Sequence, residues 1–242
     1  PDTLRRAGYL KLQLAGDRMD EKVILSLVSV FIGWFLAQGT AFVKETYLGW
    51  KLKEALLLEL SDILNQLHRS EMVYRRQLQI SAIRGIDPSV PLPVSNLFFR
   101  QYYKDVFYRI NRSQRLSYQL IHGTIDTLNS ENDDFRKFTK ETVEALNQSK
   151  DEAACSRAHS LWSERVSALY RLVQSAKWYV QFHLKNPKNP AYDIRGPVHE
   201  GYVKHVADVD KEIKNIIEGA KSLKREDFEK IYDEKLFRQT AG

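Results

Sequence analysis

The chain has 242 residues, a formal net charge of +6 and one cysteine, Cys155. A single cysteine excludes an intrachain disulfide, which fits a reducing compartment. No segment shows sustained alternation of apolar and polar residues, so the sequence predicts an all-α protein with a single N-terminal transmembrane helix that continues into an up-and-down helical bundle.

Residues 23–43, VILSLVSVFIGWFLAQGTAFV, contain no charge and one strongly polar side chain, Gln38. A helix rises about 1.5 Å per residue, so this stretch would span roughly the 30 Å hydrocarbon core of a bilayer. Two alternatives stay open: a buried core helix, which is usually shorter, and a cleaved signal peptide with residues 39–41 as its cleavage site. We interpret the stretch as a transmembrane helix because it is long and because residues 19–22 before it are net negative.

Residues 1–22 form an N-terminal leader, of which residues 1–18 show no helical period and no helix cap. Ala15-Gly16-Asp17 can be encoded by GCA-GGA-GAT, which contains a bacterial ribosome-binding sequence shortly before Met19. One hypothesis is therefore that residues 1–18 are not native, that Met19 is the true start and that the protein is bacterial. The other is an ordinary polar extension, and N-terminal sequencing of the native protein distinguishes them.

Lysine and arginine next to a span set its orientation. With a start at Met19, the N-terminal side carries Lys22 alone, against Lys44, Lys51 and Lys53 on the other side. This favours a plasma (inner) membrane protein whose C-terminal part is cytoplasmic. A native leader adds further basic residues and reverses that preference. The additional basic residues of the leader are Arg5, Arg6, Lys11 and Arg18.

Residues 44–85 are predicted to form a stalk helix that joins the bundle. Their apolar residues recur at three-, four- and seven-residue steps and make one stripe. The stripe consists of Leu52, Leu56, Leu60, Ile63, Leu67, Tyr74 and Leu78. Residues 86–94, IDPSVPLPV, contain three prolines and break the helix.

Residues 95–242 are predicted to form the helical bundle itself. Ser95 caps a helix that continues to Leu128, and the polar residues 129–134 form a turn before a shorter helix through Leu146. Two further helices cover residues 158–180 and 202–220. A second proline-containing break separates them at 186–197, and a charged tail contains Phe228, Ile231 and Leu236.

Four small residues in the apolar stretch are spaced four apart and share one helix face: Ser29, Gly33, Ala37 and Ala41. Small side chains let two membrane helices approach closely, and Gln38 beside them can form a hydrogen bond across the contact. We predict that the span self-associates into a homo-oligomer. An unchanged oligomeric state in a Gly33→Ile variant would contradict this.

The net positive charge is concentrated in residues 69–118, which carry nine Lys and Arg against three acidic residues. Residues 1–68 carry eight basic and eight acidic residues, and residues 119–242 carry twenty of each, so both parts are balanced. The nine are Arg69, Arg75, Arg76, Arg84, Arg100, Lys104, Arg109, Arg112 and Arg115. They are either solvated helix faces or a surface for an anionic partner, namely an acidic protein, nucleic acid or lipid head groups, in that order. Nucleic acid is disfavoured because no recognised motif accompanies these residues.

The sequence predicts no enzyme, no metal site and no cofactor. No histidine has Glu or Asp three positions before it, as a carboxylate-bridged metal site in a bundle requires. Cys155 and His159 lie one helical turn apart, but a lone helical thiol is more often a packing residue. There is no glycine-rich phosphate loop and no Gly-x-Ser-x-Gly elbow.

These features favour a non-enzymatic, membrane-anchored interaction or scaffold module that presents an Arg-rich hairpin to an anionic partner. The bilayer itself is its first partner. The alternative is a small oligomeric pore or membrane-disrupting effector, gated by the cytoplasmic bundle and lined by Ser26, Ser29 and Gln38.

Overall fold

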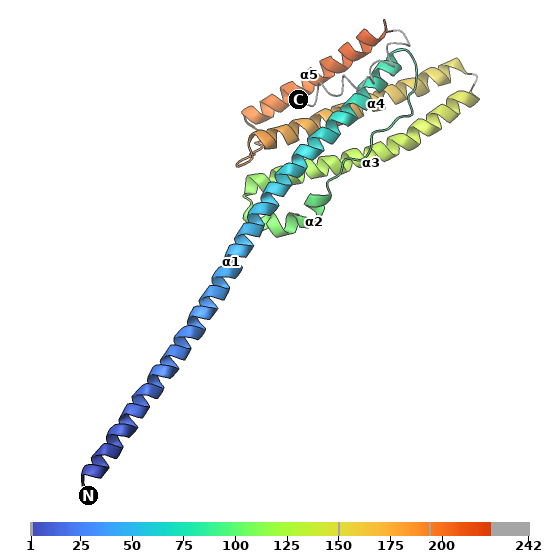
Figure 1. Ribbon diagram of the computed structural model, residues 1–242. Coiled ribbons are helices and arrows are strands. Elements are labelled where there is room, and N and C mark those ends of the chain that lie inside the picture. Colours follow the sequence, from blue (N-terminus) through green and yellow to red (C-terminus); the bar gives the residue numbers. More distant parts are fainter. Residues whose placement is uncertain (1, 150, 194, 224–242) are drawn as a thin grey trace. The chain divides into compact units, whose positions relative to one another are not determined.

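The computed structural model describes residues 2–149, 151–193 and 195–223, with side chains from residue 23 onward. The chain divides into two compact units, residues 1–52 and 53–242. All regular secondary structure in the described part is helical, as predicted (Figure 1). The elements are α1 (Asp2–Ala82), α2 (Leu97–Val106), the 3-10 helix η1 (Phe107–Arg109), α3 (Arg112–Gln148), α4 (Glu152–Lys185) and α5 (Pro197–Ala220).

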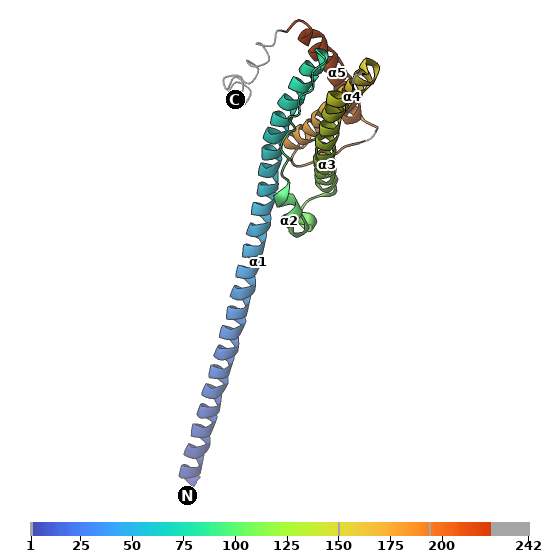
Figure 2. The same cartoon turned by 90° about the vertical axis from the view of Figure 1, so that its right-hand side faces the viewer.

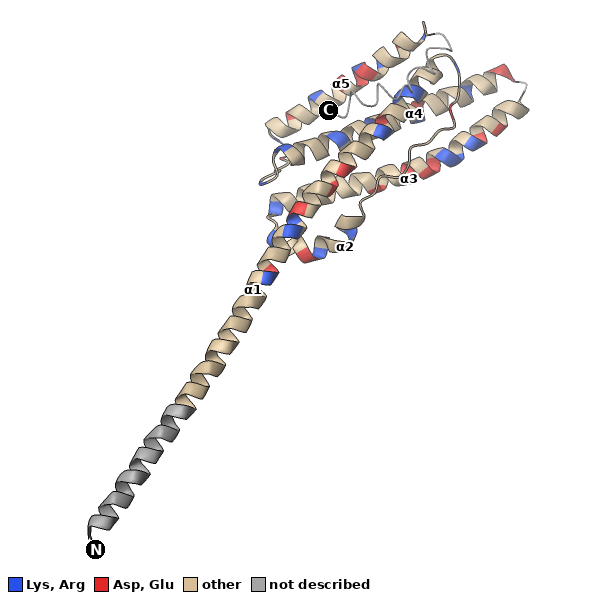
Figure 3. Ribbon diagram, in the orientation of Figure 1, with Lys and Arg blue, Asp and Glu red and all other residues tan. Residues whose placement is uncertain are grey.

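In the first unit, α1 begins at Asp2, so the backbone of the predicted leader is helical. The side chains of residues 2–22 lie outside the described part. Among the described residues, one stretch of α1 that begins at Val23 is long and apolar enough to cross a membrane, and none of its most apolar window is buried. Figure 3 shows this stretch of α1 as an uninterrupted run without charged residues. The exposure of this stretch weighs against a buried core helix. A signal sequence near the N-terminus can be equally long and apolar, so that alternative stays open.

In the second unit, residues 53–82 of α1 supply one wall of a hydrophobic core. The members of the predicted stripe that belong to this unit are fully buried, at 0 % exposure: Leu56, Leu60, Ile63, Leu67, Tyr74 and Leu78. Steps of three and four residues keep a side chain on one helix face, so the spacing alone located this wall.

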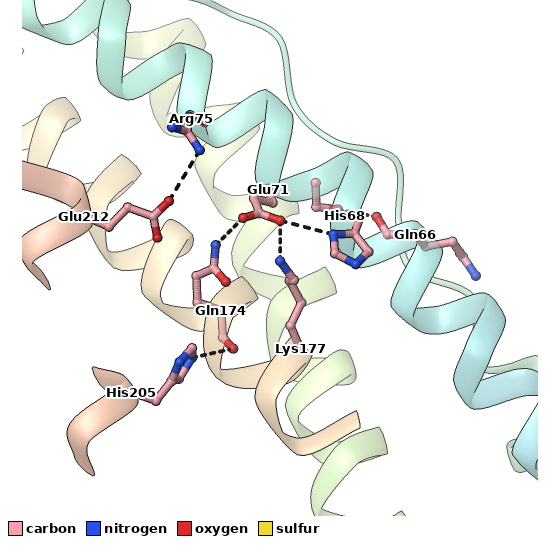
Figure 4. A network of polar contacts seen from close by, with 9 residues as sticks. Gln66, His68, Glu71, Arg75, Gln174, Lys177, His205 and Glu212 are labelled. Carbon is pink, nitrogen blue, oxygen red and sulfur yellow. Dashed lines mark hydrogen bonds and ion pairs between the residues drawn. The ribbon is translucent and has the colours of Figure 1, made fainter. Parts of the chain in front are cut away.

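Helices α3, α4 and α5 form the rest of the core, with α4 between α3 and α5 (Figures 1 and 2). Trp162 of α4 is fully buried, donates from Nε1 to Thr139 Oγ1 of α3 at 3.0 Å and packs on Phe135. Lys177 of α4 forms an ion pair with Glu71 of α1 (Figure 4). Contacts of this kind hold α1, α3 and α4 around one apolar interior.

The prediction of one helix over 95–128 is wrong, because the chain breaks between η1 and α3. The Oδ1 of Asn111 accepts from the backbone N–H of Gln114 at 2.9 Å, and the Gln114 side chain accepts from the N–H of Asn111 at 3.0 Å. This reciprocal pair is a capping box, which satisfies the first free N–H groups of α3 and starts a new helix there.

The predicted turn at residues 129–134 is also wrong, because α3 runs through it without interruption. Its polar side chains serve other segments instead. Asn129 accepts from the N–H of Val94 at 2.8 Å and donates to the Val94 carbonyl at 2.9 Å. Asn132 accepts a hydrogen bond from the hydroxyl of Tyr74 in the core.

The two proline-containing breaks are confirmed, since α1 ends at Ala82 and α4 at Lys185. After the first break, the chain returns along α1. The Gln77 side chain donates to the carbonyl of Asp87 at 3.2 Å, and the Gln66 side chain accepts from the N–H of Ser95 at 2.8 Å. This return path places the start of α2 beside the helical turn of α1 that contains Glu59. The predicted tail residues Phe228, Ile231 and Leu236 lie outside the described residues.

Candidate interaction surface

The nine predicted basic residues fall into two groups in the second unit. The first group lies on and just after α1: Arg69, Arg75, Arg76 and Arg84. The second lies on α2, η1 and the start of α3: Arg100, Lys104, Arg109, Arg112 and Arg115. The first turn of α2 contacts Glu59, and the 17 helical steps from Glu59 to Arg76 cover roughly 26 Å. The basic residues at the C-terminal end of α1 therefore do not form one continuous patch with the basic residues on α2.

Ion pairs within the protein already engage several of the arginines. Arg75 pairs with Glu212 at 3.4 Å, Arg76 with Asp87 at 3.3 Å, and Arg100 with Asp126 at 2.6 Å. Burial raises the pKa of Asp126, but hydrogen bonds from Arg100 and Asn96 outweigh it and lower that pKa overall. A partner would have to compete with these internal carboxylates.

Arg115 has a structural role at the break between η1 and α3. Its guanidinium donates to the carbonyl of Ile110 at 2.7 Å and lies 4.9 Å from the centre of the Phe107 ring. It thus satisfies a carbonyl that helix geometry leaves free and covers an aromatic face.

Outside these ion pairs, four of the nine basic residues are exposed: Arg69 and Arg84 on and just after α1, and Lys104 and Arg112 on either side of η1 at the end of α2. Lys104 and Arg112 are exposed, and within the described residues neither side chain has a hydrogen bond or ion pair. Between them lie Arg109, which is half-buried, and Tyr108, which is 91 % exposed. We call Lys104, Tyr108 and Arg112 the α2–η1 surface.

A groove of about 810 Å³ continues from this surface. Arg112 and Leu116 of α3 form one side, and Asn189, Tyr192 and Asp193 of the loop before α5 form the other. Leu116 is 55 % exposed, so the groove combines an apolar wall with charged and amide groups. Such a mixture is typical of surfaces that bind other proteins.

Glu59 of α1 holds α2 in place. Its two carboxylate oxygens accept from the N–H groups of Phe98 and Phe99 at 2.8 and 2.9 Å, while Asn96, the N-cap residue, makes no side-chain cap bond. Burial raises the pKa of Glu59, although the two backbone hydrogen bonds oppose this. His122 of α3 stacks on Phe99 with ring centres 3.6 Å apart. Helix α2 is therefore fixed by α1 and α3 through its first turn.

Replacing Glu59 with alanine is expected to loosen α2 by about 1–2 kcal/mol, because two backbone donors lose their acceptors. The measurement is amide hydrogen exchange of the full chain, which should speed up over Phe98 and Phe99. Glu59→Gln is the matched control, since it keeps one carbonyl acceptor and should show a smaller change. Equal exchange in the alanine variant and the parent would show that Glu59 does not anchor α2.

A second polar cluster lies in the core beneath α2. His183 of α4 is fully buried, and its Nδ1 lies 2.9 Å from Ser117 Oγ. Its ring packs against Tyr118, which in turn stacks on His122. In the described part of the chain, no group of three or more His, Cys, Asp and Glu is placed to hold a metal ion. Burial lowers the pKa of His122 to about 3 and that of His183 to about 4, so both rings are neutral near pH 7.

The predicted self-association face lies on an exposed stretch of α1 in the first unit. Its residues are Ser29, Gly33, Ala37, Gln38 and Ala41. A Cβ added to Gly33 would meet nothing within 4 Å, and Ser29 Oγ already donates to the carbonyl of Ser26 at 2.8 Å. Self-association through this face stays a prediction.

One feature of α1 was missed at the sequence level. Tyr47 and Trp50 stack on each other, and Lys51 Nζ lies 4.7 Å from the centre of the Tyr47 ring. The spacing of three and four residues, directly after an apolar stretch, was the signal that would have found this cluster.

No protein-family model matches the sequence, and neither the curated proteins nor the solved structures contain a significant match. The function is therefore inferred from the residues and their geometry.

Proposed function

We propose that the protein is a non-enzymatic, single-pass membrane-anchored interaction module. Residues 23–43 anchor it in the plasma membrane as a homo-oligomer, and residues 53–82 of α1 together with α2, α3, α4 and α5 form a cytoplasmic up-and-down helical bundle. The single observation behind the proposal is the contrast within α1. An uncharged, unburied stretch is followed by residues 53–82, whose apolar stripe is fully buried in a folded unit.

The partner we propose is an acidic protein that docks on the α2–η1 surface. The internal ion pairs remove several arginines of the predicted patch, whereas Lys104 and Arg112 keep their charges exposed beside Tyr108. Aromatic and basic side chains around a partly apolar groove can bind carboxylates while Tyr108 and Leu116 contribute apolar area.

We expect the double variant Lys104→Glu/Arg112→Glu to lose most of its partner binding, because it reverses the charge of the docking surface. A photo-crosslinker at Tyr108 of the full chain, in membranes, would label the partner, and the yield would be compared between variants. The matched control is Lys137→Glu/Lys140→Glu, which makes the same charge change at exposed α3 positions and should bind normally. An undiminished yield in the first variant would contradict the proposed surface.

The second candidate function is an oligomeric pore, and the exposed Gln38 in an otherwise apolar stretch favours it. An amide in lipid is costly unless it is paired or faces water. Release of a trapped dye from vesicles that carry the full chain distinguishes the two functions. A scaffold leaves the dye inside, whereas a pore releases it.

A further inference from the structure

Tyr47, Trp50 and Lys51 form an exposed aromatic and basic cluster in the first unit, directly after the apolar stretch. The ring centres of Tyr47 and Trp50 are 6.5 Å apart with planes inclined by 26°, and Lys51 Nζ lies 4.7 Å from the Tyr47 ring centre. The exposed fractions are 54 % for Tyr47 and 59 % for Trp50. We call these three residues the aromatic collar.

The chemistry of the collar suits one environment in particular. Tyrosine and tryptophan concentrate at the boundary between lipid tails and water, where the ring body is in an apolar medium and the OH or N–H is hydrated. An ammonium group beside them can reach a phosphate. We propose that the aromatic collar binds the phosphate-bearing head groups of phospholipids at the end of the span, an inference that rests on the membrane span proposed above.

The distance along α1 agrees with this position. Trp34 lies next to the middle of residues 23–43, and at about 1.5 Å per residue Tyr47 and Trp50 follow roughly 20 and 24 Å further on. The hydrocarbon core ends about 15 Å from the bilayer centre, and the head groups extend to about 20–22 Å. Helical side chains point back towards the N-terminus, and an average tilt of about 20° shortens the distance further. Both rings therefore reach the head-group layer.

The tryptophans allow the collar and the span to be tested separately in the full chain. Trp34 reports the middle of the span, and it is kept in the variant Trp50→Phe. Trp50 reports the collar, and it is kept in the variant Trp34→Phe. The protein is reconstituted into phosphatidylcholine vesicles that contain lipids with a nitroxide on the head group or bromine atoms at mid-chain. The double variant Trp34→Phe/Trp50→Phe measures the background from Trp162 and Trp178.

The expected result is that mid-chain bromine quenches Trp34 and that the head-group nitroxide quenches Trp50 more strongly than the bromine does. If Trp34 is quenched by bromine while aqueous iodide alone quenches Trp50, the span stands and the collar is overturned. Quenching of Trp50 mainly by bromine, or by no quencher at all because a second copy of the chain covers it, overturns the collar as well. If no lipid quencher reaches Trp34, the membrane span itself is overturned.

Discussion

Replacing Glu71 with leucine is expected to destabilise the second unit by about 3–5 kcal/mol, because the ammonium group of Lys177 is then buried without its partner. Lys177 Nζ donates to Glu71 Oε2, and the Gln174 side chain donates to Glu71 Oε1 at 2.6 Å (Figure 4). His68 Nδ1 lies 3.3 Å from the same carboxylate. The network thus ties α1 to α4 through one charged group.

The pKa of Glu71 reports the strength of this network. Burial would raise it, but the hydrogen bond and charge of Lys177, with contributions from Gln174 and His68, lower it overall. A carboxyl group whose pKa is lower in the folded state contributes stability above its unfolded pKa near 4.5. That contribution is lost as the pH falls through the folded pKa.

The measurement is the free energy of unfolding of the full chain in detergent, followed by tryptophan fluorescence in a Trp34→Phe/Trp50→Phe background, in which Trp162 and Trp178 report the second unit. Glu71→Leu/Lys177→Met should recover most of the loss, because it removes both charges and fills the space with apolar groups. Arg75→Ala breaks an exposed pair on the same helix and should cost at most about 1 kcal/mol. If Glu71→Leu costs no more than Arg75→Ala, the buried pair does not stabilise the unit.

The sequence revealed features that depend on neighbours along the chain. The buried stripe from Leu56 to Leu78 repeats at helical spacing, and prolines mark both breaks, so the α1 wall and the ends of α1 and α4 were predictable. The start of α3 was also visible, since Asn111 and Gln114 have the spacing of a capping box. It was missed because Val106 and Ile110 before the break and Leu120 after it were interpreted as one stripe with helical spacing.

Other features depend on contacts between residues far apart in the sequence. The residues around Asn129 resemble a turn, yet Asn129 bonds to Val94, 35 positions away, and Asn132 to Tyr74, 58 positions away. Polar side chains that form hydrogen bonds with distant residues can lie within a helix, so they do not by themselves indicate a turn. Those distant partners are not visible in a single sequence.

The same limit applies to the basic patch. Counting charges within residues 69–118 gave a surplus, but Glu212 and Asp126 from outside that window neutralise Arg75 and Arg100. A window of sequence measures composition, whereas the charge of a surface depends on which helices meet there. The exposed basic charge outside these ion pairs is therefore smaller than predicted and is divided between Arg69 and Arg84 at α1 and Lys104 and Arg112 at the end of α2.

The stability of the second unit is expected to fall as the pH decreases from about 6.5, because two buried histidines must be neutral in the folded state. Burial lowers the pKa of His122 to about 3 and of His183 to about 4, from 6.5. The unfolded chain therefore binds more protons in this range, and each histidine removes up to about 1.4 kcal/mol per pH unit. Glu59 acts in the opposite direction, since its raised pKa favours the folded state at low pH.

His122→Phe is expected to reduce this acid sensitivity to roughly half while leaving the stability at pH 7.5 unchanged or higher. Neither ring nitrogen of His122 has a hydrogen-bond partner in the described part of the chain, and a phenyl ring keeps the stacking on Phe99. The change thus removes two buried unsatisfied atoms together with the titrating group. The measurement is the free energy of unfolding of the full chain between pH 7.5 and 5.

His183→Phe is the matched comparison, because it removes the same kind of titration but also the hydrogen bond with Ser117. It should lose about 1 kcal/mol at pH 7.5 and flatten the pH dependence as His122→Phe does. If neither variant changes the slope below pH 6.5, the acid response arises from other groups. If His122→Phe destabilises the unit at pH 7.5 as much as His183→Phe does, the His122 ring makes polar contacts that phenylalanine does not replace.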